Sequence, residues 1–169
     1  MAKLQNIAFI DAQNLTQNTR NAEQPWKVDL VKLRTFLTEK YKVDKVYYFI
    51  GVKIEKNENL YKFLEHVGYE VVFREHDSKL KGIKKTNVDT DIVFYMMNHA
   101  YRKKDCDKLI LISNDGDYAR MVKQLIDDEK FYAIMFPGKN SSSLYRKINN
   151  KLVVKLYSVY NRKKLELKK

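Results

Sequence analysis

Cysteine is almost absent from this chain of 169 residues, and its scarcity excludes two kinds of covalent or metal stabilisation. Cys106 is the single cysteine, so no internal disulfide bond can form and a structural zinc site lacks thiolate ligands. A chain of this length can bury a sizeable core without either. Low cysteine usage is typical of reducing compartments, and we expect a cytoplasmic protein.

Long apolar runs are also missing. No segment approaches the roughly 20 apolar residues that cross a bilayer. The first residues, MAKLQNIAFIDAQNL, contain an apolar run of only about four residues, which is too short for a signal peptide. We therefore expect no membrane partner.

Linkers, internal repeats and low-complexity segments are absent as well. Their absence predicts a single domain over residues 1–160. The remaining residues, 161–169, form a basic C-terminal tail that we expect to fray.

Positive charge, by contrast, is abundant. The chain has 33 Lys and Arg residues against 21 Asp and Glu residues, a formal net charge of +12. Such an excess favours polyanionic partners, because Lys and Arg that neutralise phosphates release counterions. The alternative is a chain whose whole surface is basic without a nucleic-acid partner. The positions of the acidic residues help to separate these interpretations.

Apolar segments alternate with helical patterns along the chain, and the apolar segments are continuous rather than alternating. Both features are typical of a parallel sheet covered on two faces. The sequence therefore predicts an α/β fold, a three-layer α/β/α sandwich with a mainly parallel central sheet. The expected strands are 7–10, 45–51, 69–73, 108–113 and 131–136, the expected helices are 27–41, 57–68, 88–103, 115–128 and 141–150, and residues 151–160 fit either state.

Two of these helices have apolar faces that can be assigned. In 57–68 the expected inward face is Leu60, Phe63, Leu64 and Val67, and Gly68 ends the helix. In 115–128 the expected inward residues are Tyr118, Met121, Val122 and Leu125. Stacking of Tyr118 on a nucleic-acid base is the alternative there, but its place in the apolar stripe favours the core.

Four aspartates fall where the carboxyl ends of the strands are expected. Asp11 follows the first strand, and Asp115 and Asp117 follow the fourth. Asp89 shares a helical face with Ile92 and so points inward, whereas Asp91 points elsewhere or lies at the rim. Ligands of open parallel sheets bind beyond these strand ends.

Each aspartate near a helix start has a structural interpretation, since a carboxylate there can cap free N–H groups. This applies to Asp89, Asp115 and Asp117, but we find no such role for Asp11. Capping does not explain two aspartates at one helix start. Four converging carboxylates repel unless a proton or a cation offsets their charge, and Mg²⁺ or Mn²⁺ prefers such oxygen ligands.

A lysine-rich loop precedes Asp89 and is expected beside the same crevice. We interpret it as a phosphate-binding loop, with a solvated surface loop as the alternative. Its four lysines are Lys79, Lys81, Lys84 and Lys85.

Three segments together resemble the NYN-domain family of PIN-like metal-dependent nucleases, and in particular its LabA-like branch. They are FIDAQNL (9–15), KKTNVDTDIVFYMM (84–97) and LISNDGDYARMVKQL (111–125), in that order and spacing. The resemblance extends over about residues 5–150. It implies a PIN-like sheet and an RNA-cleaving activity that depends on Mg²⁺ or Mn²⁺.

The resemblance also implies roles for individual residues. It places Asp11, Asp89, Asp115 and Asp117 in the family's acidic metal site, with Asn14 among the catalytic residues and Ser113 supporting them. Asp91, at the rim by its place on the helix, is expected to support the site as well. Two positions depart from the family pattern. Asn114 replaces a glycine, a change that a residue tolerant of positive φ can accommodate, and Gly116 replaces a serine, which removes a supporting hydroxyl.

The sequence thus predicts a divalent-metal-dependent ribonuclease that hydrolyses RNA phosphodiester bonds. Two alternatives stay open: a non-catalytic nucleic-acid-binding or regulatory NYN module, and a metal-dependent phosphatase acting on small esters. Homo-oligomerisation is also left open.

Overall fold

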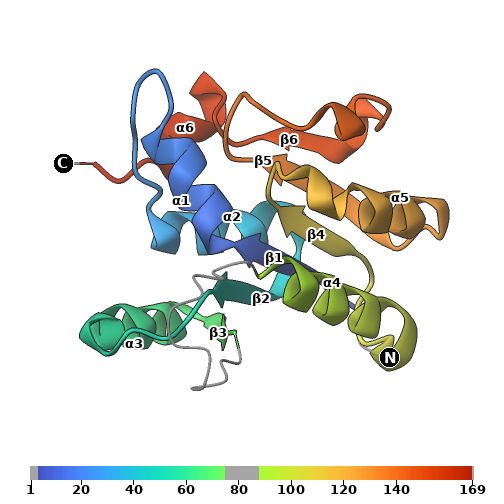
Figure 1. The fold of residues 1–169 in the computed structure, drawn as a ribbon, viewed down its shortest axis with the longest axis horizontal. Helices are drawn as coiled ribbons and strands as arrows, with labels where there is room; N and C mark the ends of the chain where they lie inside the picture. Colours follow the sequence, from blue (N-terminus) through green and yellow to red (C-terminus); the bar gives the residue numbers. More distant parts are fainter. Residues whose placement is uncertain (1–3, 75–87, 169) are drawn as a thin grey trace.

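The computed structural model describes residues 4–74 and 88–168 (Figure 1). Within them, six strands form one sheet in which every neighbouring pair is parallel, in the order β3-β2-β1-β4-β5-β6. The strands are β1 (Asn6–Asp11), β2 (Val43–Ile50), β3 (Tyr69–Phe73), β4 (Leu109–Ile112), β5 (Phe131–Phe136) and β6 (Val153–Lys155).

Helices connect these strands and cover the sheet. The α-helices are α1 (Ala12–Arg20), α2 (Leu30–Tyr41), α3 (Glu58–Val67), α4 (Asp89–Met97), α5 (Ala119–Asp127) and α6 (Val159–Leu165). A π-helical turn, η3 (Asn98–Lys103), extends α4, and the 3₁₀ turns are η1 (Glu55–Asn57), η4 (Gly116–Tyr118), η5 (Ser143–Tyr145) and η6 (Asn150–Leu152).

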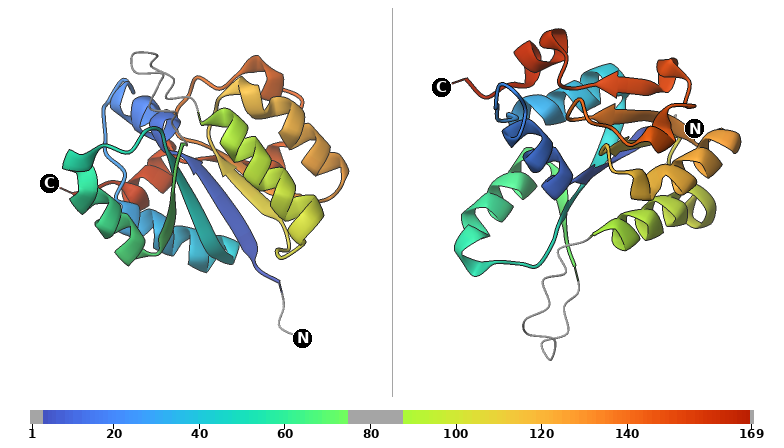
Figure 2. Two further views of the ribbon diagram at one scale, coloured as in Figure 1. Left: turned by 60° about the horizontal axis from the view of Figure 1, so that its bottom comes forward. Right: turned by 45° about the horizontal axis from the view of Figure 1, so that its top comes forward.

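Two apolar cores lie on the two faces of the sheet because successive strand residues point in opposite directions. In β1, Ile7 and Phe9 face α4 and α5, whereas Ala8 and Ile10 face α1, α2 and α6. Figures 1 and 2 show α4 and α5 side by side on one face of the sheet. The predicted three-layer α/β/α sandwich is therefore confirmed, with a central sheet that is parallel throughout.

The ambiguous segment 151–160 contains both kinds of structure. Its first half forms η6 and β6, which pairs with β5, and α6 begins at Val159. The apolar pattern could not decide because the segment changes state in its middle.

The predicted inward face of α3 was wrong in part. Leu60 and Phe63 are 44% and 43% exposed, whereas Tyr61 and Leu64 are buried. The Tyr61 ring lies 4.7 Å from that of Phe73, and its hydroxyl accepts a hydrogen bond from the Ile54 N–H group. Since α3 covers the edge of the sheet beside β3, only a narrow stripe of the helix is buried against other residues.

The expectation of a frayed tail from residue 161 was also wrong. Residues up to Leu165 belong to α6, and Leu165 is fully buried in the core shared with α2. Beyond the helix, the Leu167 N–H group donates to the Lys27 carbonyl, and Glu166 forms an antiparallel bridge with Val28. The many charged residues of this segment concealed Leu165, the apolar position that anchors it.

Among residues 4–74 and 88–168, every helix falls short of the length and apolarity that crossing a bilayer requires.

Candidate metal centre

The carboxyl ends of β1 and β4 lie next to each other in the middle of the sheet. The two strands are parallel, and Ile10 pairs with Ile112. The chain leaves β1 toward one face through α1 and leaves β4 toward the other face through η4 and α5. The connections therefore diverge at this point, which opens a crevice at the strand ends.

Three aspartates converge in this crevice. One carboxylate oxygen from each of Asp89, Asp115 and Asp117 lies within 4.8 Å of the other two. Asp89 opens α4 and is half-buried, Asp115 is half-buried after β4, and Asp117 in η4 is exposed. They line a cavity of about 290 Å³ together with Asp11, Gln13, Asn14, Gln17 and Val88.

Asp11 borders the same cavity but lies deeper. Its side chain is buried, and one carboxylate oxygen accepts a hydrogen bond from the Asn14 N–H group at 3.0 Å. Asp11 thereby caps α1, so the expectation that it has no capping role was wrong. It is not part of the group of three whose oxygens approach within 4.8 Å.

Tyr118 connects Asp11 to the other carboxylates, and sequence reasoning missed this contact. Its hydroxyl lies 2.6 Å from an oxygen of Asp89 and 3.0 Å from an oxygen of Asp11. The side chain is fully buried, as the apolar stripe predicted, so it cannot stack on a base. A tyrosine directly after the Asp115–Asp117 turn was the available signal, because a buried hydroxyl needs a partner.

Electrostatics in the cavity disfavour four bare carboxylates. Burial raises the pKa of Asp11 above its ordinary value, despite the hydrogen bonds from Asn14 and Tyr118. The neighbouring charge of Asp115 raises the pKa of Asp117, and Asp89 adds to the effect. Burial and the two nearby aspartates raise the pKa of Tyr118, which keeps its hydroxyl protonated as a donor.

The donor set fits a hard divalent cation. Three carboxylate oxygens within 4.8 Å of one another, open to solvent on the Asp117 side, are ligands of the kind that Mg²⁺ and Mn²⁺ take. No histidine or cysteine lines the cavity within the described residues, so softer metals gain no preferred ligand there.

Asn14 and Ser113 each fix part of the backbone that carries the site. The Asn14 side-chain oxygen accepts a hydrogen bond from the Asn114 N–H group at 3.1 Å, which links α1 to the end of β4. The Ser113 hydroxyl accepts one from the Asp115 N–H group at 3.2 Å. Asp115 in turn caps η4 by accepting from the Asp117 N–H group. Asp91 is half-buried and does not line the cavity.

Asn114, which stands where the family pattern has glycine, was expected to tolerate a positive φ, but the structure gives it another role. Its backbone is not in the left-handed region, which Lys42, Lys104 and Glu129 occupy among the described non-glycine residues. Instead its side-chain amide forms two reciprocal hydrogen bonds with the amide of Asn18, at 2.8 and 3.1 Å. This amide pair fixes α1 against the turn that carries Asp115.

The departure at Gly116 is explained by a close approach of the chain. A Cβ atom at Gly116 would lie 2.4 Å from the Ser142 hydroxyl oxygen and 2.9 Å from its Cβ atom. A serine at position 116 is therefore incompatible with the position of the turn at Ser142. The Ser142 hydroxyl lies in the space that the missing side chain would fill.

The lysine-rich loop cannot be placed. Lys79, Lys81, Lys84 and Lys85 lie outside the described residues, so their predicted proximity to the crevice stays a prediction.

Comparisons with known proteins agree with this architecture. The family model described as NYN domain matches residues 6–154. A crystal structure of a protein of unknown function from Vibrio parahaemolyticus is similar, with a TM-score of 0.65 and 22% identity over 80% of this chain and 82% of that one. At this identity the likeness shows the fold alone. The comparison with curated proteins found no match.

Proposed function

We propose that this chain, which belongs to the NYN domain family, is a divalent-metal-dependent ribonuclease of the LabA-like branch. The observation that carries the proposal is the convergence of Asp89, Asp115 and Asp117 at the ends of the central strands. The net charge of +12 supports a polyanionic substrate, since it attracts phosphates toward a site that is itself acidic.

The four aspartates divide into two groups in the proposed reaction. Asp89, Asp115 and Asp117 would hold Mg²⁺ or Mn²⁺, and Asp11 supplies a fourth carboxylate on the buried side of the same cavity. When bound, the cation supplies an activated water and stabilises the departing oxygen of the phosphodiester. Asn14 and Ser113 support these carboxylates through the Asn114 and Asp115 N–H groups.

Tyr118 restricts the movement of two of these groups. Because its hydroxyl lies between Asp11 and Asp89, the two carboxylates keep a fixed separation across β1 and α4. The half-buried positions of Asp89 and Asp115 limit their contact with water, which strengthens their attraction for a cation.

The direct test is cleavage of single-stranded and structured RNA by the purified protein with Mn²⁺, with Mg²⁺ and with EDTA. We expect cleavage with either cation, none with EDTA, and loss of cleavage in Asp115→Asn and Asp117→Asn. The matched control is Asp127→Asn, which removes one exposed carboxylate at the end of α5 and should cleave normally.

Two outcomes would support other functions. RNA binding without cleavage in either cation would favour the non-catalytic binding module. Hydrolysis of small phosphate esters with no action on RNA would favour a phosphatase. A cleaving activity that survives both Asp→Asn substitutions would overturn the assignment of these carboxylates to the reaction.

A further inference from the structure

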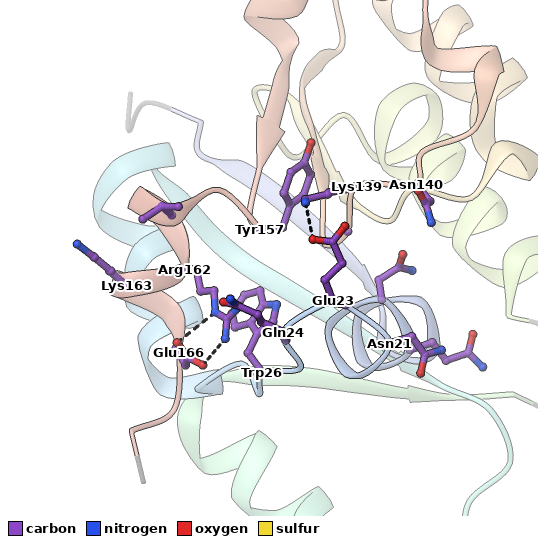
Figure 3. A pocket seen from close by; sticks show the side chains of 15 residues that line it. Asn21, Glu23, Gln24, Trp26, Lys139, Asn140, Tyr157, Arg162, Lys163 and Glu166 are labelled. Carbon is purple, nitrogen blue, oxygen red and sulfur yellow. Dashed lines mark hydrogen bonds and ion pairs between the residues drawn. The ribbon is translucent and has the colours of Figure 1, made fainter.

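A second, larger cavity lies beside the aspartate cavity. Its volume is about 770 Å³, and three segments line it: the second half of α1 with the following loop, the loop after β5, and α6 (Figure 3). Gln17 lines both cavities, so the two adjoin each other at α1. We call the larger cavity the amide groove, because its lining includes Gln17, Asn18, Asn21, Gln24 and Asn140.

Four of these amides are available to a ligand. The Asn18 side chain is hydrogen-bonded to that of Asn114. Within the part of the chain that the structure describes, no hydrogen bond is formed by the side-chain amides of Gln17, Asn21, Gln24 and Asn140. All four residues are exposed. An amide offers a donor and an acceptor side by side, which is the pattern that pairs with the edge of a nucleobase.

The groove also contains a planar cation that is already ordered. The guanidinium of Arg162 donates two hydrogen bonds to the Glu166 carboxylate, at 2.9 and 3.2 Å, and one to the Gln24 carbonyl. Its central carbon lies 5.5 Å from the centroid of the Trp26 ring. A guanidinium held in this way can stack on an unpaired base with little loss of entropy.

Charge in the groove is nearly balanced, which argues against a site for phosphate alone. Lys139 pairs with Glu23 at 3.2 Å, as Arg162 pairs with Glu166 (Figure 3). The cations Lys139, Arg162 and Lys163 thus exceed the two carboxylates by one. Neutral amides and an ordered guanidinium suit a base, and the volume lies within the roughly 300–1,000 Å³ of small-molecule sites.

From these observations we propose that the amide groove binds an unpaired nucleotide of single-stranded RNA next to the scissile phosphate and reads its base. This proposal rests on the proposed ribonuclease function. Because Gln17 lines both cavities, a bound strand that passes through the aspartate cavity also passes beside the groove. Base-paired RNA cannot present the same base edges, so the groove selects single strands.

The test combines cleavage with binding. A pool of single-stranded RNA of random sequence is cut in Mn²⁺, and the new ends are sequenced. The wild type should show about a tenfold base preference at one position beside the cut. The triple variant Asn21→Ala, Gln24→Ala, Asn140→Ala should reduce this preference to about twofold or less. The Mn²⁺ concentration that gives half-maximal cleavage should stay as in the wild type, because none of the three residues belongs to the aspartate group.

The variants keep the fold by design. The backbone groups of Gln24 and Asn140 that accept hydrogen bonds from Arg162 and Asn114 stay in place after substitution by alanine. Thermal melting checks the fold, and the single variant Asn21→Ala is used if the triple variant melts early. The matched control is Gln5→Ala, an exposed amide just before β1, which should retain the wild-type preference.

A binding arm separates this proposal from the ribonuclease proposal. Fluorescence anisotropy in EDTA measures the affinity for single-stranded and duplex RNA. One outcome is that the wild type binds single strands but cleaves no RNA, and that the triple variant loses this binding. That outcome would contradict the ribonuclease proposal and support the groove proposal. The groove proposal would be overturned if the wild type and the triple variant cleave with the same base preference. It would also be overturned if both proteins bind single strands with equal affinity.

Discussion

At the scale of single residues, the site depends on contacts that leave no buried carboxylate without a donor. Asp11 is buried, and it accepts from both the Asn14 N–H group and the Tyr118 hydroxyl. A carboxylate in such a position is tolerated only while these donors remain.

Tyr118→Phe should therefore destabilise the metal-free protein. It removes the hydroxyl between Asp11 and Asp89 without changing the packing of the ring, at a cost of about 1–3 kcal/mol in the free energy of unfolding. Saturating Mn²⁺ should narrow the difference, because a cation offsets the charge of the same carboxylates. Urea unfolding with Mn²⁺ or EDTA measures both effects, with Tyr132→Phe as the control for a more exposed tyrosine. An unchanged unfolding midpoint would show that the hydroxyl contributes nothing.

The raised pKa values of Asp11 and Asp117 make stability depend on pH. A carboxyl whose pKa is higher in the folded state contributes stability at acid pH that is lost as the pH rises through the folded-state pKa. Asp117→Asn removes one of these titrations. In EDTA, the melting temperature of the variant should exceed that of the wild type more at about pH 7 than at about pH 4. A difference that is constant with pH would mean that Asp117 is not repelled by its neighbours.

At the scale of elements, the turn after β4 and the turn before η5 fit each other closely. Gly116 has no side chain where Ser142 approaches, and the Tyr145 hydroxyl donates to the Asp115 carbonyl. The position of Asp115 and Asp117 therefore depends on a segment about 30 residues further along the chain.

A double-mutant cycle tests this fit. Gly116→Ala should cost about 1–3 kcal/mol of unfolding free energy, because the added Cβ atom lies 2.4 Å from the Ser142 oxygen. Adding Ser142→Gly removes both close contacts and should restore part of that loss, although Ser142 also caps η5. Chemical denaturation of the four proteins gives the coupling free energy. If the losses of the two single variants simply add up in the double variant, the contact between residues 116 and 142 is not the source of the destabilisation.

The final helix is an element of the core rather than a tail. Leu165 is fully buried in the core that it shares with α2, so Leu165→Ala should lower the free energy of unfolding by about 2–5 kcal/mol. Leu167→Ala, at a 44% exposed position two residues later, is the matched control and should change it far less. Equal, small losses in both variants would indicate that α6 detaches readily.

At the scale of the whole molecule, a net charge of +12 coexists with an acidic cavity. A distributed positive field brings a polyanion to the surface, whereas the carboxylates act only where a cation screens them. Binding and cleavage should therefore respond to different substitutions.

Lys84→Ala with Lys85→Ala should weaken RNA binding and reduce the slope of log affinity against log salt by about two, because each phosphate contact contributes about one. Asp117→Asn should leave binding intact or tighten it while abolishing cleavage. The control pair Lys62→Ala with Lys123→Ala removes two exposed lysines from α3 and α5. An equal effect of both pairs would indicate a uniformly basic surface without a dedicated loop.

Local features of the chain could be predicted from the sequence. The continuous apolar runs predicted the parallel sheet, and the bounds of β3 and β5 agree with those of the expected strands. The apolar stripe of η4 and α5 also agrees, since Tyr118, Met121, Val122 and Leu125 are all buried. These features follow from the alternation of β-strand side chains and the helical repeat, which are properties of neighbouring residues.

By itself, therefore, the sequence determined the layers of the fold and the presence of aspartates at the strand ends. Tertiary structure decided which groups meet: Tyr118 with Asp11 and Asp89, Asn18 with Asn114 at a separation of 96 residues, and Ser142 with Gly116. It also decided that Leu165 is buried and that Leu60 is exposed. The physical reason is that periodicity specifies which side of an element is apolar, whereas the partner of each side chain depends on how the completed layers pack.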